Sequence, residues 1–163
     1  MIRIIKPLAD KSDFDKLTDL LAKCLDCNDS FKFLSYSLIK LDRKTIERLT
    51  EKHKENGVDY IIYETNNLFS GVLAYKKNKL QGFELYLLAV DKDKQKKGIG
   101  QNLINECVRI AANDNFKSID SFVFADNKQM LRLLIKNEFR PIDIQFHARA
   151  DGVDIVKLRK YLL

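Results

Sequence analysis

The chain has 163 residues, of which 45% are hydrophobic and 32% charged, and its formal net charge is +6. This length suits one domain, over residues 1–163, whose core needs no disulfide or metal to hold it. The first residues are too polar for a signal peptide and no apolar run has the length of a membrane span, so we expect no membrane partner. Three cysteines without framework spacing favour reduced thiols in the cytoplasm.

The positive charge raises the question of nucleic-acid binding. The lysines are scattered along the chain, and aromatic residues do not alternate with them as base-stacking surfaces would require. We therefore expect a basic surface that attracts anionic ligands, rather than one that binds nucleic acid.

The first third of the chain reads as a strand and two helices. Residues 1–5 are typical of a short strand, and a turn follows at Pro7. Ser12 is a suitable N-cap for a helix whose apolar residues recur with a period of 3.6: Phe14, Leu17, Leu20, Leu21, Cys24 and Leu25. Asp42 is predicted to cap a second helix, which ends at Asn56–Gly57.

Strands dominate the remainder. Two are predicted at residues 58–65 and 69–76, joined by a hairpin turn at Asn66–Asn67. The other expected elements are a strand over 83–90, a helix after Gly100, a strand over 118–124, a helix over 127–139, and closing strands over 140–148 and 153–162 with a turn at Asp151–Gly152. The order predicts an α/β (α+β) fold, with one mixed, mostly antiparallel sheet flanked by helices.

Residues 95–100, QKKGIG, directly follow the predicted strand 83–90 and lead into a helix. A helix N-terminus offers unpaired N–H groups and a partial positive charge to a phosphate, and Gly98 and Gly100 let the main chain approach such a ligand. A dinucleotide fingerprint needs a third glycine and a ribose-binding acid, and a P-loop needs Gly-Lys-Ser/Thr. Neither pattern is present, so another phosphate-bearing cofactor is indicated.

Two segments resemble known motifs. The segment LLAVDKDKQKKGIGQNLI resembles the acyl-CoA-binding motif of the GNAT superfamily of N-acetyltransferases, and FVFADNKQMLRLLIKNEFRPI resembles that family's second motif. The resemblance covers about residues 58–147. It implies a GNAT-like single domain and acetyl-CoA as the co-substrate.

The resemblance also implies roles for individual positions. Main-chain N–H groups that would bind the CoA pyrophosphate belong to Lys96, Lys97, Gly98, Ile99, Gly100 and Gln101, with Gln95 supporting the turn. Leu88, Ala89 and Val90 would pair with the pantetheine arm as with an added strand, and the Leu88 N–H would stabilise the oxyanion of the thioester. Asn127 would contact the pantetheine, a role compatible with a plain helix N-cap.

Glu84 is the candidate general base. It lies six residues before Val90, where the histone-acetyltransferase branch of the superfamily carries its catalytic glutamate, and it interrupts an apolar strand where its pKa could be raised. The alternative is a solvated acid paired with a lysine of the adjacent hairpin. Both interpretations stay open at the level of sequence.

The chain departs from the family pattern at two positions. Leu134 stands where many members place a tyrosine that protonates the CoA thiolate, and Phe122 stands where some carry a glutamate. A dedicated general acid is therefore in doubt, and solvent or the product amine could supply the proton. Tyr86 is a substitute candidate on the strand of Glu84.

Other groups of residues give weaker indications of a site. The pair Cys24-x-x-Cys27 has zinc-site spacing but lacks further ligands nearby, since Cys107, His53 and His147 are distant in sequence, so we expect buried thiols and no metal. His147 and Arg149 either contact the acceptor or form an exposed polar rim. Acidic groups that would suit a cationic amine, together with one tyrosine, lie in the connection between the first two helices: Asp26, Asp29 and Tyr36.

The sequence thus predicts an acyltransferase that moves an acetyl group from acetyl-CoA to a primary amine by direct transfer in a ternary complex. The acceptor would be a small-molecule or peptide amine, and whether the protein forms a homodimer is left open. The alternative is a catalytically weak or inactive acyl-CoA-binding module, which the missing tyrosine at Leu134 would explain.

Overall fold

The computed structural model describes residues 1–5, 10–25 and 30–162. Its elements follow the predicted order, with two short 3-10 helices (η1 and η2) added. They are β1 (Ile2–Ile5), α1 (Lys11–Leu25), η1 (Ser30–Phe33), α2 (Arg43–Glu55), β2 (Val58–Thr65), β3 (Leu68–Asn78), β4 (Gly82–Val90), η2 (Lys92–Lys94), α3 (Ile99–Asn113), β5 (Ser118–Phe124), α4 (Lys128–Lys136), β6 (Arg140–Gln145) and β7 (Ile155–Tyr161).

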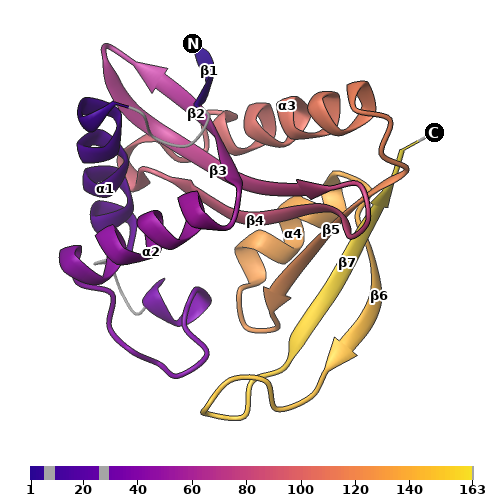
Figure 1. Ribbon diagram of the computed structural model, residues 1–163. Coiled ribbons are helices and arrows are strands. Elements are labelled where there is room, and N and C mark those ends of the chain that lie inside the picture. Colours follow the sequence, from indigo (N-terminus) through magenta and orange to yellow (C-terminus); the bar gives the residue numbers. More distant parts are fainter. Residues whose placement is uncertain (6–9, 26–29, 163) are drawn as a thin grey trace.

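The strands form one seven-stranded sheet in the order β1-β2-β3-β4-β5-β7-β6 (Figure 1). Strands β4 and β5 are parallel to each other, and every other neighbouring pair is antiparallel. The predicted mixed, mostly antiparallel sheet is therefore confirmed. The parallel pair arises because α3 carries the chain from the end of β4 back to the start of β5, as a parallel connection requires.

Two apolar layers cover the sheet. Helix α3 packs against strands β2 to β5, and its buried Leu103, Ile104 and Cys107 share a cluster with Leu134 of α4. Helices α1 and α2 pack on the opposite face over β2 to β4, where Leu17 and Ile46 are buried. Figure 1 shows that on this second face α1 and α2 lie beside the N-terminal strands, while β5, β7 and β6 extend past them.

Several local predictions are confirmed. Asp42 caps α2 by accepting a hydrogen bond from the Thr45 N–H at 2.8 Å. The hairpin turn at Asn66 and Asn67 has positive φ angles of 51° and 60°, which asparagine tolerates. The predicted N-cap at Ser12 is wrong.

Helix α1 begins one residue before Ser12, at Lys11, and Asp10 Oδ1 accepts a bond from the Ser12 N–H. An aspartate two residues earlier provides the same acceptor chemistry, so the pattern alone could not choose between the two residues. The turn expected at Pro7 lies outside the described residues.

Strand β4 contains a bulge at Tyr86. Ala74 of β3 pairs with Leu87, and the next β3 residue, Tyr75, pairs with Leu85, so Tyr86 is the extra residue. The extra residue changes which face the following side chains occupy. Leu85 belongs to the cluster under α3, whereas Leu87 belongs to the cluster under α1 and α2.

Candidate active site

The site lies where β4 and β5 separate. Their parallel pairing covers only three residue pairs and ends at Leu85 opposite Ser121, where the Ser121 hydroxyl donates to the Leu85 carbonyl at 3.3 Å. A cavity of about 900 Å³ opens beyond that point. Residues 85–90 and 121–124 form its two sides, and the loop after β4, helix α4 and the segment around η1 complete its walls.

The second half of β4 directs main-chain groups into this cavity. The N–H of Asp91 donates to the carbonyl of Ser70 in β3 at 2.9 Å. Because residues of an antiparallel ladder alternate between pairing with the neighbour and facing away from it, Leu88 and Val90 face away from β3. Their N–H and C=O groups therefore point to the side from which β5 has separated. The pairing of residues 88–90 with an extended ligand, and the role of the Leu88 N–H, stay predictions.

The loop between β4 and α3 presents a helix N-terminus to the same cavity. Lys96 and Gly98 adopt positive φ angles of 60° and 77°, and Gly98 is the N-cap of α3. Gln95 holds the loop against the strand by donating from Nε2 to the Val90 carbonyl at 3.2 Å. Lys96, Gly98, Ile99, Gly100 and Gln101 line the cavity, whereas Lys97 is exposed beside it.

The rest of this loop is tied to α1. Asp91 is buried, caps η2 by accepting from the Asp93 N–H, and binds Lys23 Nζ at 2.8 Å. Hydrogen bonds from Lys23 and from the Asp93 N–H lower the pKa of Asp91 against the opposing effect of burial. The carboxylate therefore stays charged and fixes the end of β4 next to the cavity.

Helix α4 closes the cavity from the other side. A Cβ atom at Gly100 would lie 3.3 Å from Leu133 Cδ2, so the absence of a side chain there lets α3 and α4 approach closely. Gln101 and Asn137 exchange side-chain hydrogen bonds between the two helices. Asn127 caps α4 by accepting from the Met130 N–H at 3.2 Å and also lines the cavity.

Two basic residues in this wall were missed at the level of sequence. Arg132 and Lys136 of α4 line the cavity, as does Lys96 on the facing loop. The signal that could have found them is their spacing, since residues four apart share one face of a helix.

Glu84 lies on the face of β4 toward α2, opposite Lys76 on β3 and Asp120 on β5. Burial raises its pKa and Asp120 raises it further, whereas Lys76 and Lys157 lower it. Within the described parts of the chain Glu84 makes neither a hydrogen bond nor an ion pair. The alternative role, an acid paired with a lysine of the hairpin, is therefore not supported by a contact.

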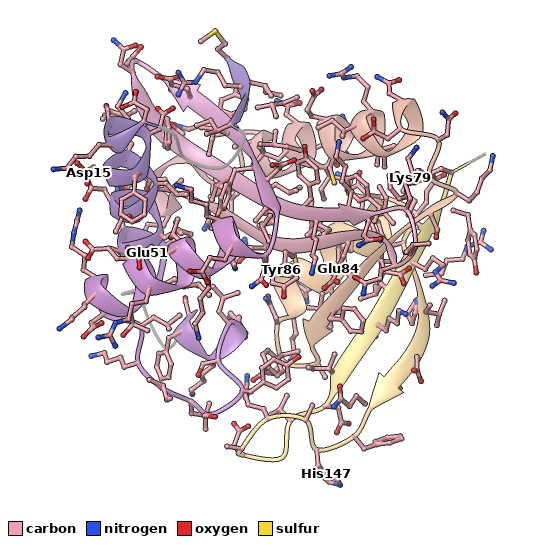
Figure 2. The ribbon with its side chains drawn as sticks, viewed as in Figure 1. Asp15, Glu51, Lys79, Glu84, Tyr86 and His147 are labelled. Carbon is pink, nitrogen blue, oxygen red and sulfur yellow. The ribbon has the colours of Figure 1, made fainter. Side chains whose placement is uncertain are left out.

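Tyr36 and Tyr86 lie near Glu84, and His53 lies near Tyr86. The Tyr86 ring contacts His53 of α2 edge-on at 5.5 Å, and Figure 2 shows the Tyr86 and Glu84 side chains next to each other at the centre of the molecule. Burial lowers the pKa of His53 to about 4, and its Nδ1 is hydrogen-bonded to the Tyr60 hydroxyl at 2.8 Å. His53 is therefore neutral near pH 7. Burial and the charges of Tyr86 and Glu84 raise the pKa of Tyr36, which places that tyrosine near both.

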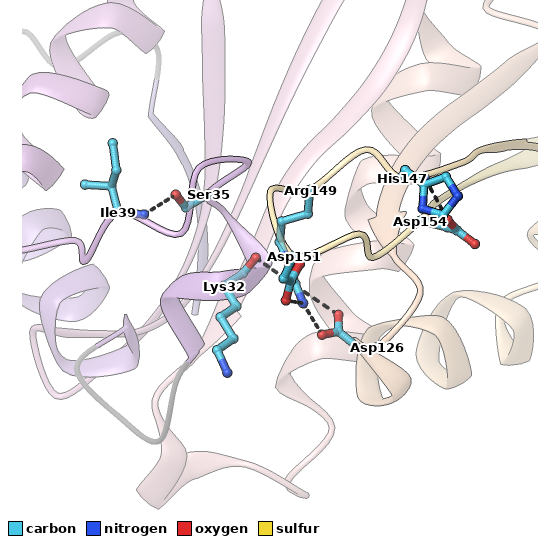
Figure 3. Close-up of polar contacts among 8 residues, drawn as sticks. All are labelled: Lys32, Ser35, Ile39, Asp126, His147, Arg149, Asp151 and Asp154. Carbon is cyan, nitrogen blue, oxygen red and sulfur yellow. Dashed lines mark hydrogen bonds and ion pairs between the residues drawn. The ribbon is translucent and has the colours of Figure 1, made fainter.

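Arg149 holds the segments beside these rings together (Figure 3). Its guanidinium binds Asp126 before α4 and Asp151 in the β6–β7 connection, with closest distances of 2.5 and 2.8 Å, and donates to the Lys32 carbonyl at 3.1 Å. The Ala150 N–H donates to the Tyr36 carbonyl at 2.8 Å. Arg149 is buried, so the expectation of an exposed polar rim is wrong for this residue.

The remaining candidates contribute less. His147 is exposed, with its main-chain N–H bonded to Asp154 Oδ1 (Figure 3). Cys107 is buried, as expected, whereas Cys24 is half-buried and lines the cavity. Asp26, Cys27 and Asp29 lie outside the described residues. Among the described residues no group of three His, Cys, Asp or Glu side chains could hold a metal ion, and no helix is long and apolar enough to cross a membrane.

The two departures from the family pattern have different surroundings. Leu134 is fully buried in the core under α3, so this position cannot deliver a proton to the cavity. Phe122 lies on the face of the sheet opposite α3, where it is 44% exposed and lines the cavity.

Comparisons with known proteins point to one family. The model of the acetyltransferase (GNAT) family matches residues 15–139. "Putative phosphinothricin acetyltransferase YwnH" of Bacillus subtilis (strain 168) is 34% identical over 91 residues, which are 56% of this chain and 51% of that protein. The match thus spans about half the length of this curated relative.

Solved structures share the whole fold. An N-acetyltransferase from Staphylococcus aureus Mu50 superposes with a TM-score of 0.76 at 15% identity, over 100% of this chain and 99% of that chain. The yncA protein of Salmonella typhimurium, solved with acetyl-CoA, superposes with a TM-score of 0.74 at 15% identity, over 100% and 95% of the two chains. At these identities the likeness concerns the fold alone.

The family match covers most of the chain and agrees with the order of the sheet, the separation of β4 from β5 and the glycine loop. It confirms the expected family, the expected class of enzyme and acetyl-CoA as the family's co-substrate. The chain belongs to the acetyltransferase (GNAT) family.

Proposed function

We propose that this protein transfers an acetyl group from acetyl-CoA to a primary amine by direct attack in a ternary complex. The observation that carries the proposal is the gap between β4 and β5, which opens immediately beyond Glu84 and exposes the main chain of residues 88–90. The acceptor would be a small molecule or a peptide. One domain over residues 1–163, acting in the cytoplasm, is part of the same proposal.

The lining of the cavity supports acetyl-CoA as the co-substrate. An extended arm can pair with Leu88, Ala89 and Val90, whose neighbour on that side has separated. The N-terminus of α3 and the loop of Gln95, Lys96, Lys97, Gly98, Ile99, Gly100 and Gln101 can hold the pyrophosphate. Asn127 lines the cavity and would contact the pantetheine. When bound, acetyl-CoA supplies an acetyl thioester.

Glu84 would remove a proton from the ammonium group of the acceptor, directly or through one water, because only the neutral amine is a nucleophile. The amine nitrogen then bonds to the carbonyl carbon as the carbon–sulfur bond breaks. The Leu88 N–H would donate to the carbonyl oxygen while it carries negative charge.

The amine nitrogen loses a second proton as the amide forms, and the departing thiolate takes up one proton. Leu134 cannot supply that proton, because it is an apolar residue buried in the core. Tyr86 lines the cavity and its side chain lies next to that of Glu84 (Figure 2), so its hydroxyl is one candidate source, and solvent is the other.

Two measurements test the function. Excess acetyl-CoA should raise the melting temperature, since a ligand that binds only the folded state stabilises it, by about 2.7 kcal/mol at one hundred times Kd. A panel of primary amines, with phosphinothricin included because of the name of the Bacillus relative, should then release free CoA thiol. No stabilisation would contradict the proposal, and stabilisation without thiol release would favour the acyl-CoA-binding module.

A further inference from the structure

Four aromatic rings surround the acceptor side of the cavity, and we refer to them as the aromatic recess: Tyr36, Tyr86, Phe122 and Phe124. Tyr86, Phe122 and Phe124 line the cavity, and Tyr36 contacts the Phe124 ring edge-on at 5.3 Å. Tyr36, Tyr86 and Phe122 are 55%, 46% and 44% exposed. Such exposed rings next to a cavity offer surface to the apolar body of a ligand.

The recess already accommodates cations. The Arg149 guanidinium carbon lies 5.0 Å from the centre of the Phe124 ring, and Lys157 Nζ lies 5.3 Å from the centre of the Phe122 ring. Both distances fall within the range of cation–π attraction. Glu84, on the same sheet face and without an ion pair in the described chain, adds a carboxylate that can attract one further ammonium.

The arginines near the recess are engaged with protein carboxylates. Arg149 binds two aspartates, and Arg159 binds both oxygens of Asp120 at 2.6 and 2.8 Å. Lys157 binds the same Asp120 at 3.0 Å. Lys76 is paired with Glu84 in the register of β3 and β4, on the side away from β5, and does not line the cavity.

The cations that do line the cavity lie near the co-substrate loop. Lys96 belongs to that loop, and Lys136 immediately precedes Asn137, which is bonded to Gln101 of α3. Arg132 lies one turn earlier on α4. Among the described residues, the cations that line the cavity therefore lie on its co-substrate side, and a carboxylate on the acceptor would lie beside Glu84 at the recess.

From these contacts we infer the class of acceptor, in a step that rests on the proposed function. The acceptor is a primary ammonium on an apolar body of about the size of an aromatic ring, with no free carboxylate on the carbon that carries the nitrogen. Arylalkylamines and the N-terminal residue of a peptide share this chemistry.

Matched substrates test the inference. The values of kcat/KM are compared for 2-phenylethylamine, L-phenylalanine, L-phenylalanine amide and ethylamine. The first two differ only by the carboxylate, and we expect kcat/KM to be about tenfold higher for 2-phenylethylamine, because the carboxylate would lie beside Glu84 in a half-exposed recess. L-Phenylalanine amide should have a kcat/KM close to that of 2-phenylethylamine. Ethylamine lacks the apolar body, so its kcat/KM should be at least about tenfold lower than that of 2-phenylethylamine.

The same comparison distinguishes a peptide N-terminus from a free amine as the acceptor. A higher kcat/KM for the amide than for 2-phenylethylamine indicates a peptide N-terminus, and the reverse indicates a free amine. A preference for L-phenylalanine over 2-phenylethylamine overturns the inference. If the kcat/KM of the amide is as low as that of L-phenylalanine, the inference is also overturned, because the site would then reject the size of the carboxylate and not its charge.

Binding gives a second readout that does not depend on turnover. Calorimetric titration of 2-phenylethylamine into the complex with CoA should show a Kd about tenfold higher for Tyr86→Leu than for the unchanged protein. Tyr86→Phe should retain the affinity, because it keeps the ring. The matched control is Phe146→Leu, which removes a 71% exposed ring that does not line the cavity and should leave Kd unchanged.

The two proposals fail differently. If acetyl-CoA does not bind, the proposed function fails. If acetyl-CoA binds and some amine is acetylated, but the Tyr86→Leu and Phe146→Leu proteins bind 2-phenylethylamine equally well, the function stands and the aromatic recess is overturned. Failure of the CoA complex to bind any member of the series overturns the recess as well.

Discussion

Glu84 is a half-buried carboxyl on the open face of a strand, with an aspartate on one neighbouring strand and a lysine on the other. Burial, the largest influence, raises its pKa above the ordinary glutamate value of about 4.3. A base acts only when deprotonated, so kcat/KM should fall as the pH falls through this raised pKa.

Replacing this carboxyl tests its role directly. Glu84→Gln should lower kcat/KM by about 10² to 10⁴ and remove the acidic limb of the pH profile. Glu51→Gln, an exposed position on α2, is the matched control and should change neither (Figure 2). An unchanged rate and pH profile in Glu84→Gln would show that another group removes the proton.

Gly98 allows a second prediction at the residue scale. Gly98→Ala meets open space but keeps a positive φ of 77°, so it should lower the free energy of unfolding by about 1 kcal/mol. Because Gly98 is the N-cap of α3 at the cavity, we also expect KM for acetyl-CoA to rise.

A second glycine provides the control for that strain. Gly57→Ala, at a φ of 68° with equally open surroundings, should cost about the same stability. Gly57 follows α2 and does not line the cavity, so its replacement should leave KM for acetyl-CoA unchanged. Equal KM values in the two variants would count against a role for this loop in binding.

At the scale of elements, Arg149 joins three segments that have no shared strand or helix: the η1 segment, the turn before α4 and the β6–β7 connection. Arg149→Met should lower the free energy of unfolding by about 2 kcal/mol. Removing one partner of a wholly buried ion pair costs roughly 3–5 kcal/mol. The cost here is smaller because the Asp126 and Asp151 side chains are 39% and 37% exposed and stay hydrated.

The same substitution should raise KM for the amine more than KM for acetyl-CoA. Arg149 packs on Phe124, and the next residue, Ala150, is bonded to Tyr36, whereas neither contacts the glycine loop in the described structure. Arg109→Met, which breaks an exposed pair with Glu106 on α3, serves as the control and should stay within about 0.5 kcal/mol of the unchanged protein. Equal changes in the two KM values would argue for a purely structural role.

Elements whose cause is local could be predicted from the sequence. The cap at Asp42 and the turn at Asn66–Asn67 depend on a few neighbouring residues, and both were found as expected. The bulge at Tyr86 could not be predicted, because it exists only in the register of β4 against β3. The contacts of Arg149 were equally hidden, since its partners lie as far as 117 residues away along the chain.

At the scale of the whole molecule, the net charge of +6 should attract the polyanionic co-substrate from a distance. Raising NaCl from about 20 to about 300 mM shortens the Debye length several-fold, so KM for acetyl-CoA should rise several-fold while KM for the amine changes less. Steady-state kinetics at both salt concentrations would measure this.

The position of the charges matters as well as their number. Replacing both Arg132 and Lys136 by glutamine should raise KM for acetyl-CoA and weaken its salt dependence, because both residues line the cavity. Replacing Lys44 and Arg48, which are exposed on α2 with the same spacing, changes the net charge equally and is the control. Identical salt curves for the two double variants would mean that net charge alone governs the effect.

The bulge at Tyr86 divides β4 into a first half with side chains at the proposed acceptor side and a second half whose main chain faces the proposed co-substrate site. Main-chain groups are the same whatever the residue, whereas the acceptor wall changes with each substitution at positions 36, 84, 86, 122 and 124. Substitutions in such a chain can therefore change which amine it accepts without changing the main-chain contacts proposed for CoA. A library randomised at the four ring positions should keep its affinity for acetyl-CoA, and its members should differ in the amines they accept.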